Sequence, residues 1–517
     1  KLKEQLGKAF AKIQSKTGTA SVVAVATGKT YGDGDLYQAQ FDSKDWSGKV
    51  VSLRPKTTAT GTLDASQNWD AGEKITTLNS GSRQILTYKP SADKGIPFRW
   101  PASPTSPSAN ELDTVQAQAL SDLKTDGTYD YTKGADRLAF LRGVNSKEGT
   151  TADTFRKRSS DLGDIVNSNP VYVARPNLRY DLTCGSTTYS SFITANADRQ
   201  HILYVGSNDG MLHGFDAGLK DATTGLFSSG TGLETIAYVP SVVFKNLKLL
   251  TRQDYNPTSA STGASANALN NSMHHYYVDS RSIISDACFD AAWHSVLIGR
   301  LGAGGREVFA LEVTKPADFA ESKADSLVRW ELTADDDADL GYTFGGSWIV
   351  QMNNGEWAAV FGNGYNSDEA TGLCSDGLPV GNGCDKHTPS ATLVKGSGNA
   401  VLFIVNVKTG AVIKKIAVPT PTVCSDDLPI GSGCDTHTPP ASLMSNVGLS
   451  SPYIYDVDGD GKTDWIYAGD MAGNLWKFDV RSSDSSAWTV KLLFTAKNSA
   501  GVRQPITSPP IVIAQPQ

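Results

Sequence analysis

The clearest pattern along the chain is a pair of apolar strands joined by a tight turn, and it occurs twice. Residues His201–Asp216 and Asp464–Asp479 each contain an apolar strand that ends in glycine, a glycine-containing turn, and a second strand that ends in Phe-Asp. In both copies the strand-ending glycine and the final aspartate are ten residues apart. Short apolar runs bounded by glycine predict buried strands, and two of them around a tight turn predict a β-hairpin.

Further apolar strands flank each hairpin, so the repeating unit is predicted to be a sheet of four strands. We predict five such units, near residues 20–90, 163–240, 274–333, 341–417 and 446–497, and a sixth that begins at Gln504. A single four-stranded sheet cannot bury both of its faces, whereas radially stacked sheets bury them and leave only short edges. The predicted fold class is therefore all-β, a modified β-propeller of about six to seven blades.

Two regions depart from the strand pattern and bear on the domain organisation. Apolar residues between Leu2 and Ile13 follow helical spacing and predict an N-terminal helix over residues 1–18. The remaining residues, 19–517, are predicted to form one β-propeller domain with short helical insertions. Residues 91–160 are predicted to be a helical or irregular insertion, or a degenerate blade.

Two nearly identical segments bounded by cysteines predict loop inserts in the propeller, at residues 367–398 and 417–446. Each contains a Cys-x9-Cys spacing with proline and glycine between the cysteines. This composition favours two compact loops closed by the disulfides Cys374–Cys384 and Cys424–Cys434. Zinc held by cysteine and histidine is the alternative, although the spacing is not a usual zinc pattern.

The other two cysteines, Cys184 and Cys288, can pair with one another or stay free. Disulfides form in oxidising compartments, so the cysteine pattern predicts an exported protein. Because the chain begins at Lys1 without a signal peptide and ends in a strand-like run, we expect further sequence on both sides.

Charge and hydropathy argue against a nucleic-acid partner and against a membrane-spanning segment. The formal net charge is −7 and the pI is about 5.6, which argues against a nucleic-acid-binding protein because such proteins present a basic surface. No apolar stretch approaches the roughly 18 residues that a membrane span requires. We therefore predict no nucleic-acid partner and no membrane span in this chain.

The strongest chemical signal is an acidic loop with the sequence DVDGDGKTD. Asp456, Asp458, Asp460 and Asp464 occupy positions 1, 3, 5 and 9 of this loop, and the carbonyl of Lys462 falls at position 7. Calcium is a hard cation that binds six to eight oxygens, and alternate residues of a tight loop can direct their carboxylates into one cavity. The loop predicts a Ca²⁺ site made by these five residues, between the first two strands of one blade.

Two other interpretations of this loop stay open, and a second acidic segment is judged separately. The loop is not an EF-hand, because position 12 is Tyr467 where that motif requires glutamate, and the residues that follow read as a strand. It could also be an acidic turn without an ion, or hold Mg²⁺, whose strict octahedron suits dense carboxylates poorly. A second acidic cluster, Asp335–Asp339, lacks glycine and alternate spacing and is predicted to be a solvated turn.

The chain contains no recognisable catalytic motif, so we predict that it is not an enzyme. It has no adjacent cysteine pair, GxSxG, HExxH or P-loop, and its seven histidines are scattered and predicted to pack or lie on the surface. Asp70–Gly72 and Lys408–Gly410 are similar to a structural repeat of quinone-dependent propeller dehydrogenases. A quinone- or metal-dependent periplasmic oxidoreductase is therefore one alternative, and a passive structural propeller is another.

Six segments together resemble the PilC/PilY-type family of type IV pilus biogenesis and tip-adhesin proteins, in its C-terminal domain. The first is GDIVNSNPVYV at Gly163–Val173, and the others are Tyr204–His213, Leu301–Gly305, Leu340–Gly345, Phe361–Asn366 and Tyr467–Asp479. The resemblance covers nearly the whole chain. The two cysteine-bounded inserts depart from the family pattern.

The resemblance implies a modified propeller with one calcium loop, and the five residues of the acidic loop named above match that loop position by position. It implies a location at the pilus tip or cell surface, in the outer membrane or periplasm. The implied partners are the major and minor pilins of the pilus fibre, together with host or abiotic surfaces. The implied function is to support pilus extension, oppose retraction, and aid surface attachment and twitching motility.

Overall fold

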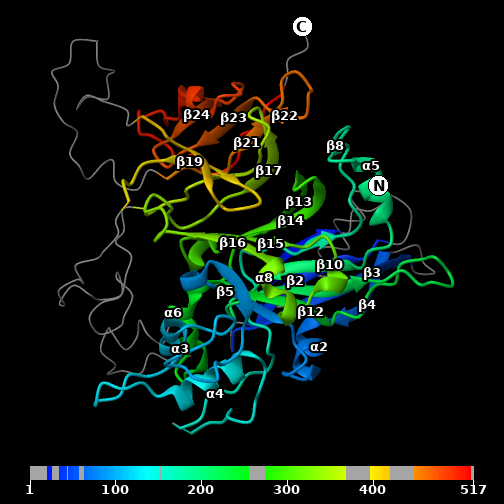
Figure 1. The fold of residues 1–517 in the computed structure, drawn as a ribbon, viewed down its shortest axis with the longest axis vertical. Helices are drawn as coiled ribbons and strands as arrows, with labels where there is room; N and C mark the ends of the chain where they lie inside the picture. The colour runs from blue at the N-terminus through cyan, green and yellow to red at the C-terminus, as the bar shows by residue number, and fades with distance from the viewer. Residues whose placement is uncertain are drawn as a thin grey trace. The chain divides into compact units, whose positions relative to one another are not determined.

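The computed structural model describes residues 20–25, 34–42, 45–57, 63–151, 153–255, 274–367, 396–419 and 448–513 of the 517-residue chain (Figure 1). The chain divides into two compact units. The first unit comprises Lys1–Ile284 and Leu311–Trp330, and the second comprises Ser285–Ala310 and Glu331–Gln517. Strands predominate in the described residues and most of them pair antiparallel, which confirms the predicted all-β class.

The first sheet has four antiparallel strands in chain order, β1 (Ala20–Val25), β2 (Leu36–Asp42), β3 (Ser47–Thr57) and β4 (Leu63–Asp70). Its inward side chains pack against the next sheet in one apolar cluster that includes Tyr37, Val50, Trp69, Leu203 and Phe215. Helix α2 (Ala71–Thr77) follows β4 directly, and the Asp70 side chain caps it by accepting a hydrogen bond from the Gly72 amide.

The second sheet has the order β6-β5-β12-β11-β10-β7. Its strands are β5 (Ile85–Lys89), β6 (Lys94–Pro97), β7 (Val171–Val173), β10 (His201–Gly206), β11 (Leu212–Gly218) and β12 (Glu234–Val239). The predicted hairpin at His201–Asp216 is confirmed as β10 and β11. The first predicted four-stranded sheet, near residues 20–90, is shorter in the structure. β5 does not join the sheet of β1 to β4, because it pairs in parallel with β12. All five β5 residues are buried, so this strand needs neighbours on both faces.

Two helices lie within residues 91–160, α3 (Thr114–Leu120) and α4 (Tyr131–Leu141), and they pack side by side (Figure 1). Asp113 and Gln116 form a capping box at the start of α3, with N···O distances of 2.9 and 3.0 Å. The Asp130 side chain accepts from the Lys133 amide and caps α4 in a similar way. Local capping therefore favours these two helices in a chain in which strands predominate.

The remaining elements of the first half are short. They are β8 (Thr183–Cys184), β9 (Thr187–Thr188), α5 (Tyr189–Ala195), η1 (Pro90–Ala92), η2 (Ser241–Val243), α6 (Phe244–Leu247) and η3 (Lys248–Thr251).

The third sheet has the order β13-β14-β15-β16, with β13 (Ile283–Phe289), β14 (Ala292–Arg300), β15 (Glu307–Glu312) and β16 (Val328–Thr333). Short helical turns lie between its strands, namely η4 (Gly302–Gly304), η5 (Pro316–Asp318), η6 (Glu321–Lys323) and α8 (Ala324–Leu327). The strand order follows the chain order, as expected for one blade of a propeller.

The second unit contains two further sheets. One has the order β20-β19-β18-β17-β22, with β17 (Ser347–Met352), β18 (Trp357–Gly362), β19 (Val401–Asn406), β20 (Val412–Ala417) and β22 (Lys462–Thr463). The other has the order β21-β23-β24-β25, with β21 (Tyr453–Tyr455), β23 (Trp465–Gly469), β24 (Asn474–Asp479) and β25 (Thr489–Thr495); η9 (Ser485–Ala487) precedes β25. The predicted hairpin at Asp464–Asp479 is confirmed as β23 and β24.

A continuous apolar core joins these two sheets. Buried side chains from β18 and β19, such as Val360 and Ile404, belong to the same cluster as Ile466, Trp476 and Phe478 from the last sheet. Every residue of β18 is buried, whereas buried and half-buried residues alternate along β24. The last sheet therefore buries one face in this core and leaves its other face partly accessible.

Several sequence predictions fall outside the described residues. These are the N-terminal helix at 1–18, nearly all of the two cysteine-bounded inserts, and the disulfides Cys374–Cys384 and Cys424–Cys434. Cys184 and Cys288 are both disulfide-bonded, and no described cysteine is free. Among the described residues, no helix is both long enough and apolar enough to cross a membrane.

Candidate metal centre

The acidic loop lies between β21 and β23, which pair antiparallel with Tyr455 opposite Trp465. This is the connection between the first two strands of the last sheet, where the sequence analysis predicted it. Within the loop, β22 pairs in parallel with β17 of the neighbouring sheet (Figure 1). The loop is therefore held at both ends and in its second half by backbone hydrogen bonds.

The structure brings three of the predicted carboxylates together. Asp456, Asp458 and Asp464 each offer an oxygen, and these oxygens all lie within 4.8 Å of one another. Asp464 is buried, Asp456 is half-buried and Asp458 is exposed, so the cluster opens to solvent on the Asp458 side. Three carboxylates this close repel one another unless a cation lies between them.

Backbone amides of the loop hold the Asp456 carboxylate in place. The Gly459 and Gly461 amides donate hydrogen bonds to its two oxygens at 2.8 and 2.9 Å. Both glycines have positive φ angles, 79° and 85°, which residues with a side chain rarely adopt. The two glycines therefore allow the loop to turn tightly around the first predicted ligand.

Asp460 and Lys462 form a pair of their own. The Lys462 ammonium lies 2.7 Å from Asp460 Oδ2, and the Lys462 amide donates to Asp460 Oδ1 at 2.8 Å. The hydrogen bonds from Lys462 lower the pKa of Asp460, and the same contact raises the pKa of Lys462. Asp460 is thus beside the three-carboxylate cluster but outside it, with its charge balanced by a lysine.

One residue that anchors the site was missed by the sequence analysis. The Asn353 side-chain amide, from the turn between β17 and β18, donates to the Thr463 carbonyl at 2.8 Å and to Asp464 Oδ1 at 3.2 Å. The Val457 amide donates to the other Asp464 oxygen at 2.9 Å. A contact over 111 residues leaves no local signal, and only the placement of the two sheets in space brings Asn353 to the loop.

The donor set fits a hard divalent cation. All side-chain donors of the cluster are carboxylate oxygens, which calcium and magnesium prefer and which soft metals do not. The glycine-rich loop leaves the exposed side of the cluster open for water or for the Asp460 carboxylate. A flexible oxygen cage suits calcium better than magnesium, because magnesium demands near-ideal octahedral geometry.

The rival acidic cluster has a different environment. The Lys415 ammonium lies 2.9 Å from Asp337 and 3.0 Å from Asp339, and Asp336 accepts hydrogen bonds from the amide and hydroxyl of Thr333. The carboxylates of Asp336, Asp337 and Asp339 are thus paired with a lysine or cap a turn. This segment needs no metal ion to balance its charge.

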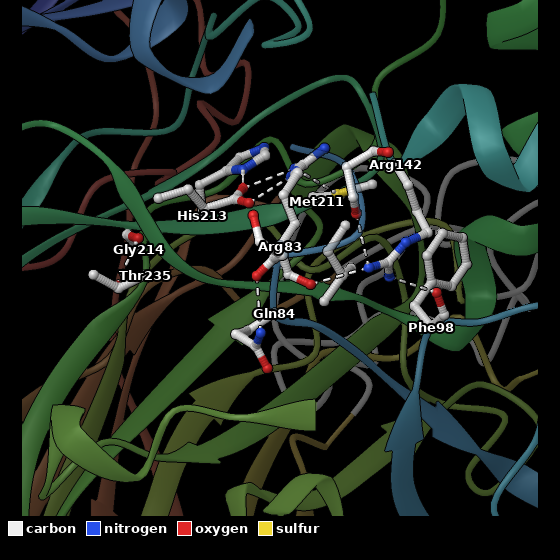
Figure 2. A network of polar contacts seen from close by, with 12 residues as sticks. Arg83, Gln84, Phe98, Arg142, Met211, His213, Gly214 and Thr235 are labelled. Carbon is white, nitrogen blue, oxygen red and sulfur yellow. Dashed lines mark hydrogen bonds and ion pairs between the residues drawn. The ribbon is translucent and has the colours of Figure 1, made fainter. Parts of the chain in front are cut away.

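A second group of charged residues lies buried in the first unit, around β11 and β12 (Figure 2). Arg83 Nε lies 2.6 Å from Glu234 Oε2, and His213 Nδ1 lies 2.7 Å from Glu234 Oε1. The other ring nitrogen of His213 lies 3.1 Å from Asp209. The side chains of Arg83, Glu234 and His213 are at most 2% exposed. We call these four residues the buried charge cluster.

The pKa values of the buried charge cluster follow from its mutual pairing. Burial opposes the protonation of His213, but Asp209 and Glu234 outweigh it and raise the pKa of His213 to about 9. Burial likewise opposes the ionisation of Glu234, but Arg83 and His213 outweigh it and lower the pKa of Glu234 to about 2. The cluster thus carries two positive and two negative charges that balance one another at neutral pH.

Arg142 extends the polar contacts on the side of Arg83 away from His213 (Figure 2). Its guanidinium donates to the carbonyls of Phe98 and Arg83 at 2.9 and 3.0 Å and lies 2.8 Å from Glu321 Oε1. These contacts tie strand ends and loops to one another. The buried charge cluster is therefore a structural feature of the first unit. The sequence analysis gave His213 a packing or surface role and missed its ionic partners.

Two polar side chains of the GDIVNSNPVYV segment form hydrogen bonds within the first unit. Asp164 accepts from Asn208 Nδ2 at 2.7 Å and lies 2.9 Å from His274 Nε2, while the Ser168 hydroxyl accepts from the Gly206 amide at 2.8 Å. Asp164 and Ser168 are each 1% exposed. These side chains therefore join neighbouring loops of the first unit and are not accessible to a ligand in solvent.

Sheets built around four antiparallel strands, three of them with their strands in chain order, are typical of the class of modified β-propellers. The family model for the PilY1 beta-propeller domain matches residues 162–378 and 381–517. The chain therefore belongs to the PilY1 beta-propeller domain family, and the resemblance seen in the sequence is confirmed.

Individual relatives agree with this assignment. The chain is 33% identical over 542 residues to a type IV pilus biogenesis factor PilY1 homolog of Xylella fastidiosa, an alignment that covers 98% of this chain and 32% of the relative. It is 32% identical over 510 residues to the type IV pilus biogenesis factor PilY1 of Pseudomonas aeruginosa strain UCBPP-PA14, covering 93% of this chain and 36% of the relative. The chain thus spans about a third of the length of these relatives.

A solved structure is also similar. The crystal structure of the Pseudomonas aeruginosa PilY1 C-terminal domain matches with 30% sequence identity and a TM-score of 0.43. The match covers 67% of this chain and 56% of that domain.

Proposed function

We propose that this chain is a calcium-binding domain of a type IV pilus assembly factor and tip adhesin. The proposal is supported by membership of the PilY1 beta-propeller domain family and by relatives named as type IV pilus biogenesis factors. The observation that carries the calcium part is the meeting of Asp456, Asp458 and Asp464 oxygens within 4.8 Å. The protein is exported and acts at the cell surface or pilus tip, in the outer membrane or periplasm.

In this proposal the ion replaces repulsion among the carboxylates by attraction and stiffens the loop between β21 and β23. Asp456, Asp458 and Asp464 bind it first, because they already converge. Asp460 and the Lys462 carbonyl complete the set when the Asp460 carboxylate leaves the Lys462 ammonium. Calcium binding is therefore coupled to a rearrangement within the loop.

The proposed role of this rearrangement is to set the state that pilus subunits recognise. The ion-bound form supports pilus extension and opposes retraction, and the ion-free form permits retraction. The coupling can be no larger than the difference in ion affinity between the two states. The proposed partners are major and minor pilins, with host or abiotic surfaces contacted at the tip during attachment and twitching motility.

The test is an Asp464→Asn substitution in the full-length protein, in a bacterium that assembles type IV pili. We expect fewer surface pili and reduced twitching, with little response to added calcium. An Asp335→Asn variant, which changes an exposed aspartate outside the loop, is the matched control and should behave as the unsubstituted protein. Normal piliation and twitching of the Asp464→Asn strain across calcium concentrations would refute the switch.

A passive structural propeller is one competing function, and a quinone- or metal-dependent periplasmic oxidoreductase is the other. A passive propeller predicts that Asp464→Asn lowers the melting temperature in calcium but leaves piliation unchanged. An oxidoreductase of the quinone class predicts an absorbing cofactor in the purified protein. Melting curves, pilus counts and an absorption spectrum of the same preparation therefore separate the three functions.

A further inference from the structure

β25 is the outer strand of the last sheet and is exposed along most of its length. Its consecutive residues Leu492, Leu493 and Phe494 are 39%, 46% and 58% exposed. No other strand in the described ranges exposes three consecutive large apolar side chains. Large apolar side chains exposed together on one strand indicate a place where another surface binds.

The backbone of β25 is also free along one edge. β25 pairs with β24 on one side, from Asn474 opposite Thr495 to Asp479 opposite Thr489. On its other side, no backbone group of the described residues forms a hydrogen bond with it. A row of unpaired amides and carbonyls is a template on which a further strand can add.

The outer strand of the neighbouring sheet lacks this property. β20 carries Lys414 and Lys415 in its middle, and the Lys415 ammonium is held between Asp337 and Asp339. The short helix η9 packs against β20 as well. Charged side chains and a covering segment are the usual protection of a strand edge. β25 has one lysine followed by three apolar residues, and so lacks that protection.

The accessible face beside β25 is positively charged. Lys477 of β24 lies opposite Lys491 of β25, and the Lys477 ammonium lies 3.1 Å from the centre of the Trp465 ring. Arg481 lies over the same ring at 5.6 Å. The nearby acid Asp479 is already bound to Arg481, at 2.7 Å. A second copy of this chain would bring the same cations together, whereas an acidic segment would meet them with opposite charge.

We propose that β25 binds an extended, acidic segment of a partner protein, which adds to the last sheet as a further strand. Carboxylates of the segment face Lys477 and Lys491, and the apolar side chains that alternate with them cover Leu492 on the other face of the sheet. Phe494, which an irregularity in the register brings opposite Leu475, contacts the end of the segment. Backbone hydrogen bonds along the free edge supply affinity, and the alternating side chains supply specificity. The proposal does not depend on calcium, because β25 lies across β24 and β23 from the acidic loop.

The test uses the purified chain and two synthetic peptides of about eight residues, one alternating valine with glutamate and one alternating valine with lysine. Fluorescence anisotropy measures binding, and hydrogen exchange measures protection of the β25 amides. We expect the glutamate peptide to bind at least about tenfold more tightly than the lysine peptide. We also expect it to slow exchange in β25 and not in β20.

Two variants locate the site. Lys491→Glu should reduce or reverse the preference for the glutamate peptide, and Phe494→Asp should weaken both peptides. Val412→Asp, at a 40% exposed apolar residue of β20, is the matched control and should bind as the unsubstituted chain does. Unchanged melting temperatures would show that all three variants fold.

Three results would overturn the proposal. They are equal affinity for the two peptides, affinity that none of the β25 substitutions changes, and no binding by either peptide. A dimer in sedimentation that Phe494→Asp abolishes would also overturn it, because a second copy would then occupy the edge. Neither a success nor a failure here decides the calcium proposal, which is tested at Asp464.

Discussion

Two regions of the molecule concentrate charge in opposite ways. The buried charge cluster of Arg83, Asp209, His213 and Glu234 pairs two positive with two negative side chains, away from solvent. The acidic loop of the second unit brings three carboxylates within 4.8 Å of one another, and its one lysine is bound to a fourth carboxylate, Asp460.

The difference between the two regions is whether the charges are balanced by the chain itself. A balanced cluster holds its strands together and needs nothing from outside, so it indicates a structural role. An unbalanced cluster leaves repulsion between its carboxylates that an external cation can offset, so it is the better place to look for a ligand. The acidic loop is therefore the better candidate for function, even though the buried charge cluster contains the more strongly shifted pKa values.

The largest effect is expected from breaking the balanced cluster. Glu234→Gln leaves Arg83 and His213 buried without their shared carboxylate and should lower the free energy of unfolding by roughly 3–5 kcal/mol. Urea denaturation measures this loss. The exposed Glu73→Gln variant is the control and should change the unfolding free energy by less than about 0.5 kcal/mol. A similarly small loss for Glu234→Gln would show that the buried charges contribute little.

The next effect is expected from removing the external cation. At a calcium concentration of about 100 times the dissociation constant, binding should stabilise the folded chain by about 2.7 kcal/mol. A chelator should remove this stabilisation, as seen in the melting temperature. Asp458→Asn should remove most of it in calcium but cost little in chelator, because it relieves repulsion between carboxylates. An equal loss with and without calcium would mean that the loop is a structural turn.

Changing the pH should affect the two regions differently. The folded-state pKa of His213, about 9, lies above its ordinary value, so its pairing stabilises the fold fully below about pH 6.5. This contribution, on the order of 1–3 kcal/mol, is lost as the pH rises through 9. The pairing of Glu234, with its pKa of about 2, is present above about pH 4.5 and is lost as the pH falls through 2.

Unfolding measurements from pH 6 to 10 check the histidine contribution. His213→Asn should lower stability at pH 6 and flatten the decline toward pH 9. A decline of equal size in the variant would show that other groups titrate in that range.

The smallest effect is expected from the lysine of the acidic loop. Lys462→Met removes a positive charge near the cluster and frees Asp460. At roughly 6 Å in water a divalent cation and a unit positive charge repel one another by about 1.4 kcal/mol, so calcium should bind about tenfold more tightly. Calorimetric titration measures the change, and Lys491→Met, outside the loop, should leave it unaltered. Weaker binding by Lys462→Met would mean that the lysine helps to shape the site.

Much of the fold could be predicted from local patterns. The two hairpins were found because apolar runs bounded by glycine leave a clear signal. The pairing of β5 with β12 was missed, because the sequence of five buried residues does not indicate which sheet the strand belongs to. Sheet membership depends on packing between distant segments, which a local pattern does not contain.

The candidate site shows the same division. Three carboxylates meet as the spacing in the loop predicted, since those ligands are close in sequence. The contact of Asn353 with Asp464 and the pairing of Arg83 with Glu234 join residues more than 100 positions apart. The pairing of Asp460 with Lys462 was also missed, because ligand spacing alone does not show which carboxylate a nearby lysine will hold.

The central claim is that the acidic loop binds one calcium ion, and calorimetric titration of the purified chain with Ca²⁺ tests it most directly. We predict one ion per chain, with binding abolished by Asp464→Asn and unchanged by Asp335→Asn. Absence of binding at millimolar Ca²⁺, or binding that survives Asp464→Asn unaltered, would contradict the claim.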